Sequence, residues 1–285
     1  MSFSVNTNIG AMAALQSLAD TGKGMSTVQS RITTGLNVAS TKDDSSAYTI
    51  AQSLRSDLGQ MTSVTKSLSR AKSVTDVAVA CAEQISDLVN QMKANATQAA
   101  DAGIDTASRA AINKDFVALR DQVTTIVNAS DFNGTNLLKT GGGSVTALQS
   151  IKDGDTTSAT TWDPDALGVA NQGLDLGGSV VTVAATDTIA TQATAQAMVD
   201  TLTTTQTNLN TSLSDLGAAS RKIDAQTSFT SKLSDTITAG IGNLVDADLA
   251  KESAKLQALQ VKQQLGVQAL SIANQAPQSI MSLFR

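Results

Sequence analysis

The sequence from Ile50 to Met92 reads IAQSLRSDLGQMTSVTKSLSRAKSVTDVAVACAEQISDLVNQM, and apolar side chains recur along it at a helical spacing. Twelve steps between these side chains cover 42 residues, a mean of 3.5 residues a step, which is the period of a coiled coil. A helix with such a seam cannot stay in water alone, so the pattern predicts partner helices elsewhere in the chain. The seam positions after Ile50 are Leu54, Leu58, Met61, Val64, Leu68, Ala71, Val74, Ala78, Cys81, Ile85, Leu88 and Met92.

Two further segments offer partners for this seam. After a turn at Gly103, apolar residues predict an antiparallel return helix that ends before Asp131. From Leu209 to Ile237 the apolar seam again has a step of 3.5 residues. We interpret the two halves of the chain as one hairpin, and two separate helical segments in one bundle are the plainer alternative. The predicted packing residues of this part are Leu54, Leu68, Ile85, Leu216, Ile223 and Leu233.

The two ends of the chain predict one helix each. A helix from about Phe3 to Leu36 has one apolar stripe, and Asp44 and its neighbours cap the next helix near Ser46. A last helix, beyond Gly242, is apolar on several faces, which one partner cannot cover, so self-association is expected. Its glutamines add amide contacts between copies or are simply solvated. The predicted self-assembly residues are Ile9, Leu15, Leu18, Leu259, Leu270, Ile272, Ile280, Leu283 and Phe284.

These elements predict a mainly α fold. It is an antiparallel bundle of long coiled-coil helices from the N- and C-terminal halves, with a small loop and β-hairpin insertion in the middle. The terminal helix pair comprises 1–42 and 243–285, and the helical rod comprises 43–139 and 195–242. The middle, 140–194, is rich in Gly, Ser and Thr and poor in large apolar residues. We therefore expect it to be exposed at one tip of the rod.

The composition argues against an enzyme. Histidine is absent among the 285 residues, which removes the commonest general base and metal ligand. The sequence shows no paired nucleophile and base, no metal cluster and no phosphate-binding glycine loop. We therefore predict no catalytic, metal-binding or cofactor-binding residues, and no cofactor.

Charge and hydropathy limit the other function classes. A net charge of −5, without a Lys/Arg cluster among aromatic residues, argues against a nucleic-acid partner. No window approaches the roughly 18 continuous apolar residues of a membrane span, and no standard secretory signal begins the sequence. Cys81, the single cysteine, lies among Val and Ala and is interpreted as a small buried hydrophobe.

Four runs of residues resemble bacterial flagellins, in the order expected for that family. They are Ser4-Val5-Asn6-Thr7-Asn8-Ile9 near the start, the linker Ile32-Thr33-Thr34-Gly35-Leu36-Asn37-Val38-Ala39-Ser40-Thr41-Lys42-Asp43-Asp44, the turn Asp131-Phe132-Asn133-Gly134-Thr135-Asn136-Leu137-Leu138, and the C-terminal region from Leu244-Val245-Asp246-Ala247-Asp248-Leu249-Ala250 to Leu283-Phe284. The resemblance covers both ends of the chain and omits only the middle.

This resemblance implies a structural subunit of the hollow helical filament used for swimming. The paired terminal helices would line the filament core, the rod would form the next shell, and the middle would face outward. Export through the flagellar type III apparatus would place the protein outside the cell. The implied partners are many copies of the same chain, the hook–filament junction and cap proteins, and an export chaperone on the C-terminal helix.

Three alternatives remain open at this point. A junction protein of the hook–filament boundary would share the helical ends but would usually diverge between Leu244 and Phe284. A secreted coiled-coil adhesin or translocator would bind host cells without polymerising. An enzyme is the third alternative, and no motif supports it.

Overall fold

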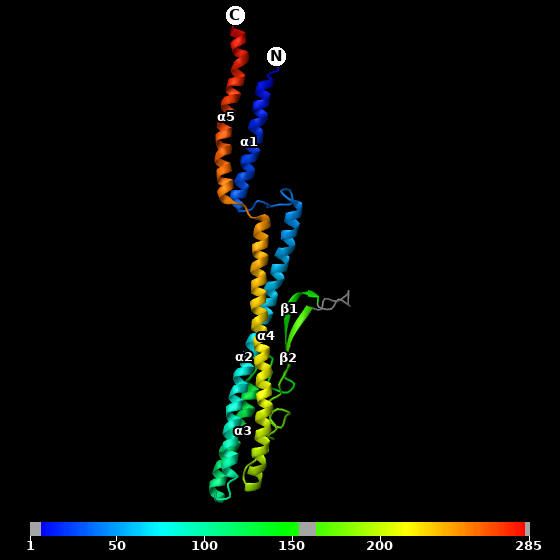
Figure 1. Cartoon of the computed structure of the whole chain (residues 1–285), viewed down its shortest axis with the longest axis vertical. Helices are drawn as coiled ribbons and strands as arrows, with labels where there is room; N and C mark the ends of the chain where they lie inside the picture. The colour runs from blue at the N-terminus through cyan, green and yellow to red at the C-terminus, as the bar shows by residue number, and fades with distance from the viewer. Residues whose placement is uncertain (1–6, 154–163, 283–285) are drawn as a thin grey trace. The chain divides into compact units, whose positions relative to one another are not determined.

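A computed structural model describes residues 7–153 and 164–282 of the chain, with side chains for 7–151 and 165–275. The secondary structure is mainly helical with one two-stranded antiparallel sheet, as the sequence predicted (Figure 1). The elements are α1 Ile9–Thr34, α2 Ser45–Ala99, α3 Thr106–Ala129, β1 Val145–Asp153, β2 Pro164–Val169, α4 Gln192–Val245 and α5 Leu249–Ser282. The chain forms two compact units, residues 57–235 and residues 1–56 with 236–285.

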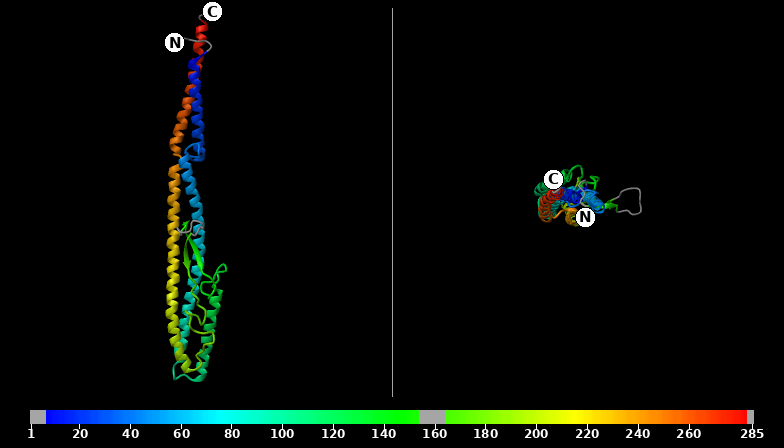
Figure 2. Two further views of the ribbon diagram at one scale, coloured as in Figure 1. Left: turned by 90° about the vertical axis from the view of Figure 1, so that its right-hand side faces the viewer. Right: turned by 90° about the horizontal axis from the view of Figure 1, so that it is seen from above.

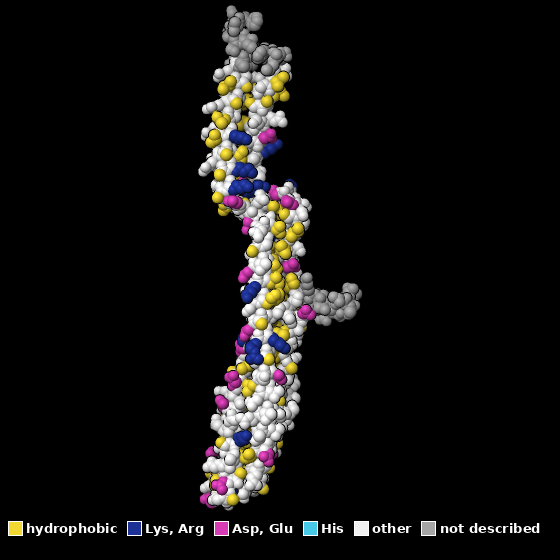
Figure 3. Space-filling view, in the orientation of Figure 1, with side chains coloured by type: hydrophobic (Ala, Val, Ile, Leu, Met, Phe, Trp, Pro, Cys, Tyr) yellow, Lys and Arg dark blue, Asp and Glu magenta, His cyan; other side chains and the backbone are white. Residues whose placement is uncertain are grey.

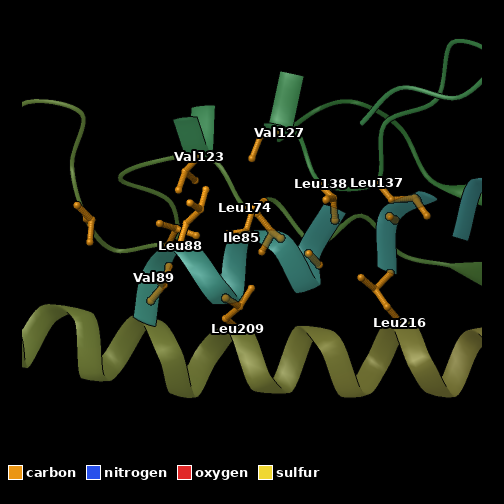
Figure 4. Close-up of a cluster of buried hydrophobic side chains, with 14 of the residues drawn as sticks. Ile85, Leu88, Val89, Val123, Val127, Leu137, Leu138, Leu174, Leu209 and Leu216 are labelled. Atoms are coloured by element: carbon orange, nitrogen blue, oxygen red, sulfur yellow. The ribbon is translucent and has the colours of Figure 1, made fainter. Parts of the chain in front are cut away.

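The unit of residues 57–235 is built on the predicted seam of α2. Leu68 and Ile85 of α2 are fully buried, and so are Leu216 and Ile223 of α4. In Figure 4, Leu209 and Leu216 point from α4 toward α2, while Val123 and Val127 approach α2 from α3. The step of 3.5 residues therefore identified the packed face of α2, with Cys81 half-buried in it. Burial raises the pKa of the Cys81 thiol.

The turn between α2 and α3 is held by side chains that satisfy the helix ends. Asp105 caps α3 by accepting a hydrogen bond from the backbone N–H of Ser108 at 2.7 Å. Arg109 donates from Nε to the carbonyl of Ala99 at 2.9 Å and from Nη2 to the carbonyl of Asp101 at 2.9 Å. These donors occupy carbonyls that a helix C-terminus otherwise leaves unpaired.

The middle segment corrects the expectation that residues 140–194 are exposed at one tip. In its described part, β1 lies along both long helices: Ser67 Oγ of α2 accepts from the N–H of Leu148 at 3.1 Å, and Gln226 Nε2 of α4 donates to the carbonyl of Gln149 at 2.7 Å (Figure 1). Seven apolar side chains of the segment are buried in the same core as the helices, namely Val145, Ala147, Val169, Leu174, Val181, Val183 and Ile189.

The reason for this burial is the difference in helix length. α3 has 24 residues, whereas α2 has 55 and α4 has 54, so α3 covers only part of the apolar face that the long helices share. The middle segment covers more of that face. Side chains bind its backbone where it has no regular ladder: Asn113 Oδ1 accepts from the N–H of Ile189 at 2.7 Å, and Thr205 Oγ1 accepts from the N–H of Thr182 at 3.2 Å.

The unit of residues 1–56 with 236–285 contains two linkers that pair with each other. The N–H of Asn37 donates to the carbonyl of Val245 at 2.7 Å, and the N–H of Ala247 donates to the carbonyl of Gly35 at 2.9 Å. Gly35 has a φ of 72°, in the left-handed region that ends helix α1. The predicted start of the last helix just after Gly242 is wrong, because α4 continues to Val245 and α5 begins at Leu249.

Candidate assembly surface

The terminal helices α1 and α5 lie side by side and antiparallel in both Figure 1 and Figure 2. Glycines allow close approach at two places: a Cβ built on Gly24 would lie 3.6 Å from Leu259 Cδ1, and a Cβ built on Gly266 would lie 3.3 Å from Leu18 Cδ1. Leu259 and Leu18, which the sequence predicted as assembly residues, therefore pack against these two glycines. Such contacts use small residues to bring the helix backbones together.

The ends of the contact are held by polar groups. At the N-terminal end of α1, Asn8 caps the helix by accepting from the N–H of Ala11 at 3.1 Å. The same side chain donates from Nδ2 to the carbonyl of Ala273 in α5 at 2.8 Å. Near the other end, Arg31 Nη1 lies 3.3 Å from Glu252 Oε1. One residue of α1 thus caps its own helix and bonds to the partner helix.

Large apolar side chains of this pair are left on the surface, as Figure 3 shows over both helices. Ile9 is 75% exposed and Ile272 is 69% exposed, and Leu15 is also exposed. Leu18, Leu259 and Leu270 are half-buried. The side chain of Ile280 is outside the described residues, as are Leu283 and Phe284. Beyond the predicted self-assembly residues, the exposed apolar residues of these two helices include Met12, Leu249, Val261, Leu265 and Val267.

The pair of Arg31 and Glu252 was not foreseen from the sequence. The Glu252 side chain is 9% exposed and that of Arg31 is 25% exposed. Arg31 Nε and Glu252 Oε2 are buried and have no hydrogen-bond partner among the described residues. No motif marks these residues, and their pairing follows only from the way α1 lies against α5.

Polar contacts also organise the linker that follows α1. Asp43 Oδ2 accepts hydrogen bonds from the Ser40 hydroxyl and the Ser40 N–H at 3.0 Å each, and from the Ala39 N–H at 3.2 Å. The hydrogen bonds from Ser40 hold the pKa of the Asp43 carboxyl below its usual value. Next along the chain, Asp44 Oδ1 accepts from the N–H of Ser46 at 2.9 Å and so caps α2 where the sequence predicted.

A charged network joins α2 to α4 in the unit of residues 57–235. Lys72 Nζ lies 2.9 Å from Asp76 Oδ1, 3.2 Å from Asp224 Oδ2 and 2.8 Å from Ser220 Oγ. The hydrogen bond to Asp76 is the main cause of a raised Lys72 pKa. Leu54 and Leu233, which were also predicted to pack in the helical bundle, are half-buried.

The described residues offer little to a small ligand. An open groove of about 430 Å³ between α1 and α5 is lined largely by polar or charged side chains, including Gln16, Asp20 and Lys262. Within the described ranges, no cluster of three or more His, Cys, Asp or Glu residues could hold a metal ion. No helix in the same part of the chain is long and apolar enough to cross a membrane.

Comparisons with known proteins match both halves of the chain. The bacterial flagellin N-terminal helical region matches residues 5–141, and the bacterial flagellin C-terminal helical region matches residues 197–284. The protein named flagellin FljM, from Caulobacter vibrioides, is 44% identical over 99% of this chain and 98% of its own length. A flagellin of Brucella melitensis is 37% identical over 99% of each chain.

One of the solved structures that match this chain is also a flagellin. The crystal structure of Bacillus cereus flagellin is 20% identical, covers 57% of this chain and 88% of its own, and superposes with a TM-score of 0.48.

Proposed function

Because this chain belongs to the bacterial flagellin family and is a structural subunit of the flagellar filament, we propose that its α1–α5 pair carries the contacts that join one subunit to the next. The observation that supports this most directly is the row of exposed apolar side chains on both helices, from Ile9 on α1 to Ile272 on α5. Removing such side chains from water favours association by roughly 25 cal/mol per Å² of apolar surface. A polymer of identical subunits buries this surface in every copy.

The rest of the molecule supports the same role. The core of residues 57–235 is built jointly by α2, α3, α4 and the middle segment, so most of the apolar face that these helices share is buried within one chain. Assembly contacts are therefore expected first at α1 and α5. Flagellin is a structural family, and this is consistent with a chain that acts as a structural component and not as an enzyme.

The finer features of the proposal follow from the family. The subunit is exported through the flagellar type III apparatus and stays outside the cell in the filament. Cap and hook–filament junction proteins meet the filament at its ends. An export chaperone covers α5 before assembly, because this helix exposes apolar residues on more than one face, such as Val261, Leu265 and Val267.

A pair of neighbouring substitutions tests the assembly surface. Val267 is apolar and exposed, and Gln268 beside it is polar and exposed. Val267→Asp places a charge where we expect a subunit contact and should abolish seeded polymerisation, because a charge cannot be buried unpaired without a large cost. Gln268→Asp carries the same charge one residue away and should polymerise more readily than Val267→Asp.

Sedimentation of seeded protein measures the outcome, and circular dichroism checks that both variants keep the helix content of the parent. Equal polymerisation of Val267→Asp and the parent would contradict the proposed placement of the contacts. Failure of the parent chain to polymerise onto seeds would contradict the proposed function itself.

A further inference from the structure

The apolar contacts between α1 and α5 permit more than one alignment of the two helices. In the structure Gly24 faces Leu259, and Gly266 faces Leu18. Leucines also occur three residues before each of these, at Leu256 and Leu15. Residues three apart share one face of a helix. If α5 slid by three residues along α1, Gly24 would therefore face Leu256, and Gly266 would face Leu15.

Two features distinguish these alignments. The N–H of Ala247, just before α5, donates to the carbonyl of Gly35, and the ion pair holds the helices themselves. Arg31 Nη1 lies 3.3 Å from Glu252 Oε1 in the observed alignment. After a slide of three residues, Arg31 would face Leu249 and Glu252 would face Val28. Both charges would then lose their partner. Glu252 is buried, and it would face the buried apolar side chain of Val28. A buried charge without a partner is strongly unfavourable, whereas a leucine that replaces another leucine is not.

We infer that Arg31 and Glu252 are positioning residues that, together with the pairing of Gly35 and Ala247 in the linkers, select one register of the α1–α5 pair against the register displaced by three residues. The inference rests on the proposed function, because register matters most if this pair forms the subunit contacts. A slide of three residues shifts one helix by roughly 4.5 Å against the other. Subunits in the two registers would then present the exposed apolar side chains of α1 and α5 in different relative positions.

The burial of the pair makes it suited to this role. Besides the contact between Nη1 and Oε1, Arg31 Nε and Glu252 Oε2 are buried with no partner among the described residues. Substituting one member of the pair therefore leaves additional buried polar atoms unsatisfied on the other. Replacing both members by apolar residues removes that penalty and leaves the glycine and leucine contacts intact. In such a double variant, a change in the alignment of α1 and α5 can be detected without the loss of stability that an unpaired buried charge would cause.

Cysteine cross-linking in the full chain reads out the register. In a Cys81→Ala background, Gly24→Cys with Leu259→Cys reports the observed register, and Gly24→Cys with Leu256→Cys reports the displaced one. With Arg31 and Glu252 present, the first cross-link should exceed the second by more than about tenfold, the ratio that corresponds to 1.4 kcal/mol. With Arg31→Met and Glu252→Met, the linker pairing still favours the first cross-link, but the yield of the second should rise relative to the first.

A charge exchange serves as the matched control. Arg31→Glu with Glu252→Arg restores an ion pair and should restore the full preference for the first cross-link. Single Glu252→Arg, which opposes two cations, should weaken it. Cross-links are read on both soluble and seeded protein, so that failure to polymerise is scored separately and counts against the proposed function. If the Met variant keeps the first cross-link alone, or if the exchanged pair does not restore it, the register inference is overturned.

Discussion

The backbone N–H of Asn37 donates to the carbonyl of Val245 at 2.7 Å, which joins the linker after α1 to the end of α4. Leu36 and Asp246 form an isolated antiparallel bridge at the same place. Beneath it, Val38, Ala51, Ile241 and Val245 form a small buried cluster. Two chain segments that are far apart in sequence thus stabilise each other where the terminal helix pair begins.

Gly35 is expected to be important for this linker pairing. Its φ of 72° is unfavourable for any residue with a Cβ, although the space beside it is open. Gly35→Ala should destabilise the unit of residues 1–56 with 236–285 by about 1 kcal/mol. Gly59→Ala, in the middle of α2 and also in open space, should instead stabilise α2 by about 0.5–1 kcal/mol. Denaturant unfolding followed by circular dichroism measures both, and equal effects would contradict the backbone argument.

Leu68 tests the predicted seam of α2. It is fully buried, so Leu68→Ala should lower the free energy of unfolding by about 2–5 kcal/mol through lost packing and the cavity left behind. Ser63→Ala, at an exposed position of the same helix, should change it by less than about 0.5 kcal/mol. Thermal unfolding gives the comparison. An unchanged melting temperature for Leu68→Ala would refute the burial of the seam.

The Lys72 network predicts a dependence on alkaline pH. Because the folded-state pKa of Lys72 is raised above the ordinary value of 10.5, its contribution is complete below that value and is lost as pH rises through the folded pKa. The denaturant midpoint of the parent should therefore fall above pH 10.5. Lys72→Met should remove part of that fall, whereas Lys66→Met on the same helix should not. Parallel curves for all three proteins would speak against the network.

Asn136 should be essential to the turn that follows α3. Its buried Oδ1 accepts from the N–H groups of Leu138 and Lys139 at 2.9 Å each, and its Nδ2 donates to the carbonyl of Val127 at 2.6 Å. Asn136→Ala removes the acceptor of the Leu138 and Lys139 N–H groups, while the Val127 carbonyl keeps the Ser130 hydroxyl as a donor, and it should cost about 2–4 kcal/mol of stability. Asn133 has a φ of 54°, so Asn133→Gly should be neutral or slightly stabilising. Hydrogen exchange of the Leu138 amide reports the local effect, and undiminished protection in Asn136→Ala would argue against this role.

Periodicity was sufficient to predict the helical part of the fold. Six packing residues were chosen from spacing alone; Leu68, Ile85, Leu216 and Ile223 are fully buried, and Leu54 and Leu233 are half-buried. Capping residues located the start of α2 at Asp44 and its neighbours. Both signals are local, because one turn of helix determines which side chains share a face and which groups need caps.

The contacts made by the middle segment could not be predicted in the same way. Leu174, Val181 and Val183 lie in a stretch broken by Gly177 and Gly178, and no helical period marks them as buried. Their burial depends on the length of α2 and α4 left uncovered by α3, which is a property of the whole bundle. The pairing of Arg31 with Glu252 depends likewise on the alignment of two helices distant in sequence. Such contacts arise from tertiary packing and carry no local pattern.

The most direct test of the assembly role is electron microscopy of the purified chain seeded with filament fragments. The full chain should grow filaments, and a chain shortened before Leu249, which lacks α5, should grow none while keeping the fold of residues 57–235. Filaments from the shortened chain, or soluble full-length protein with intact terminal helices that never adds to seeds, would contradict the assignment of subunit contacts to α1 and α5.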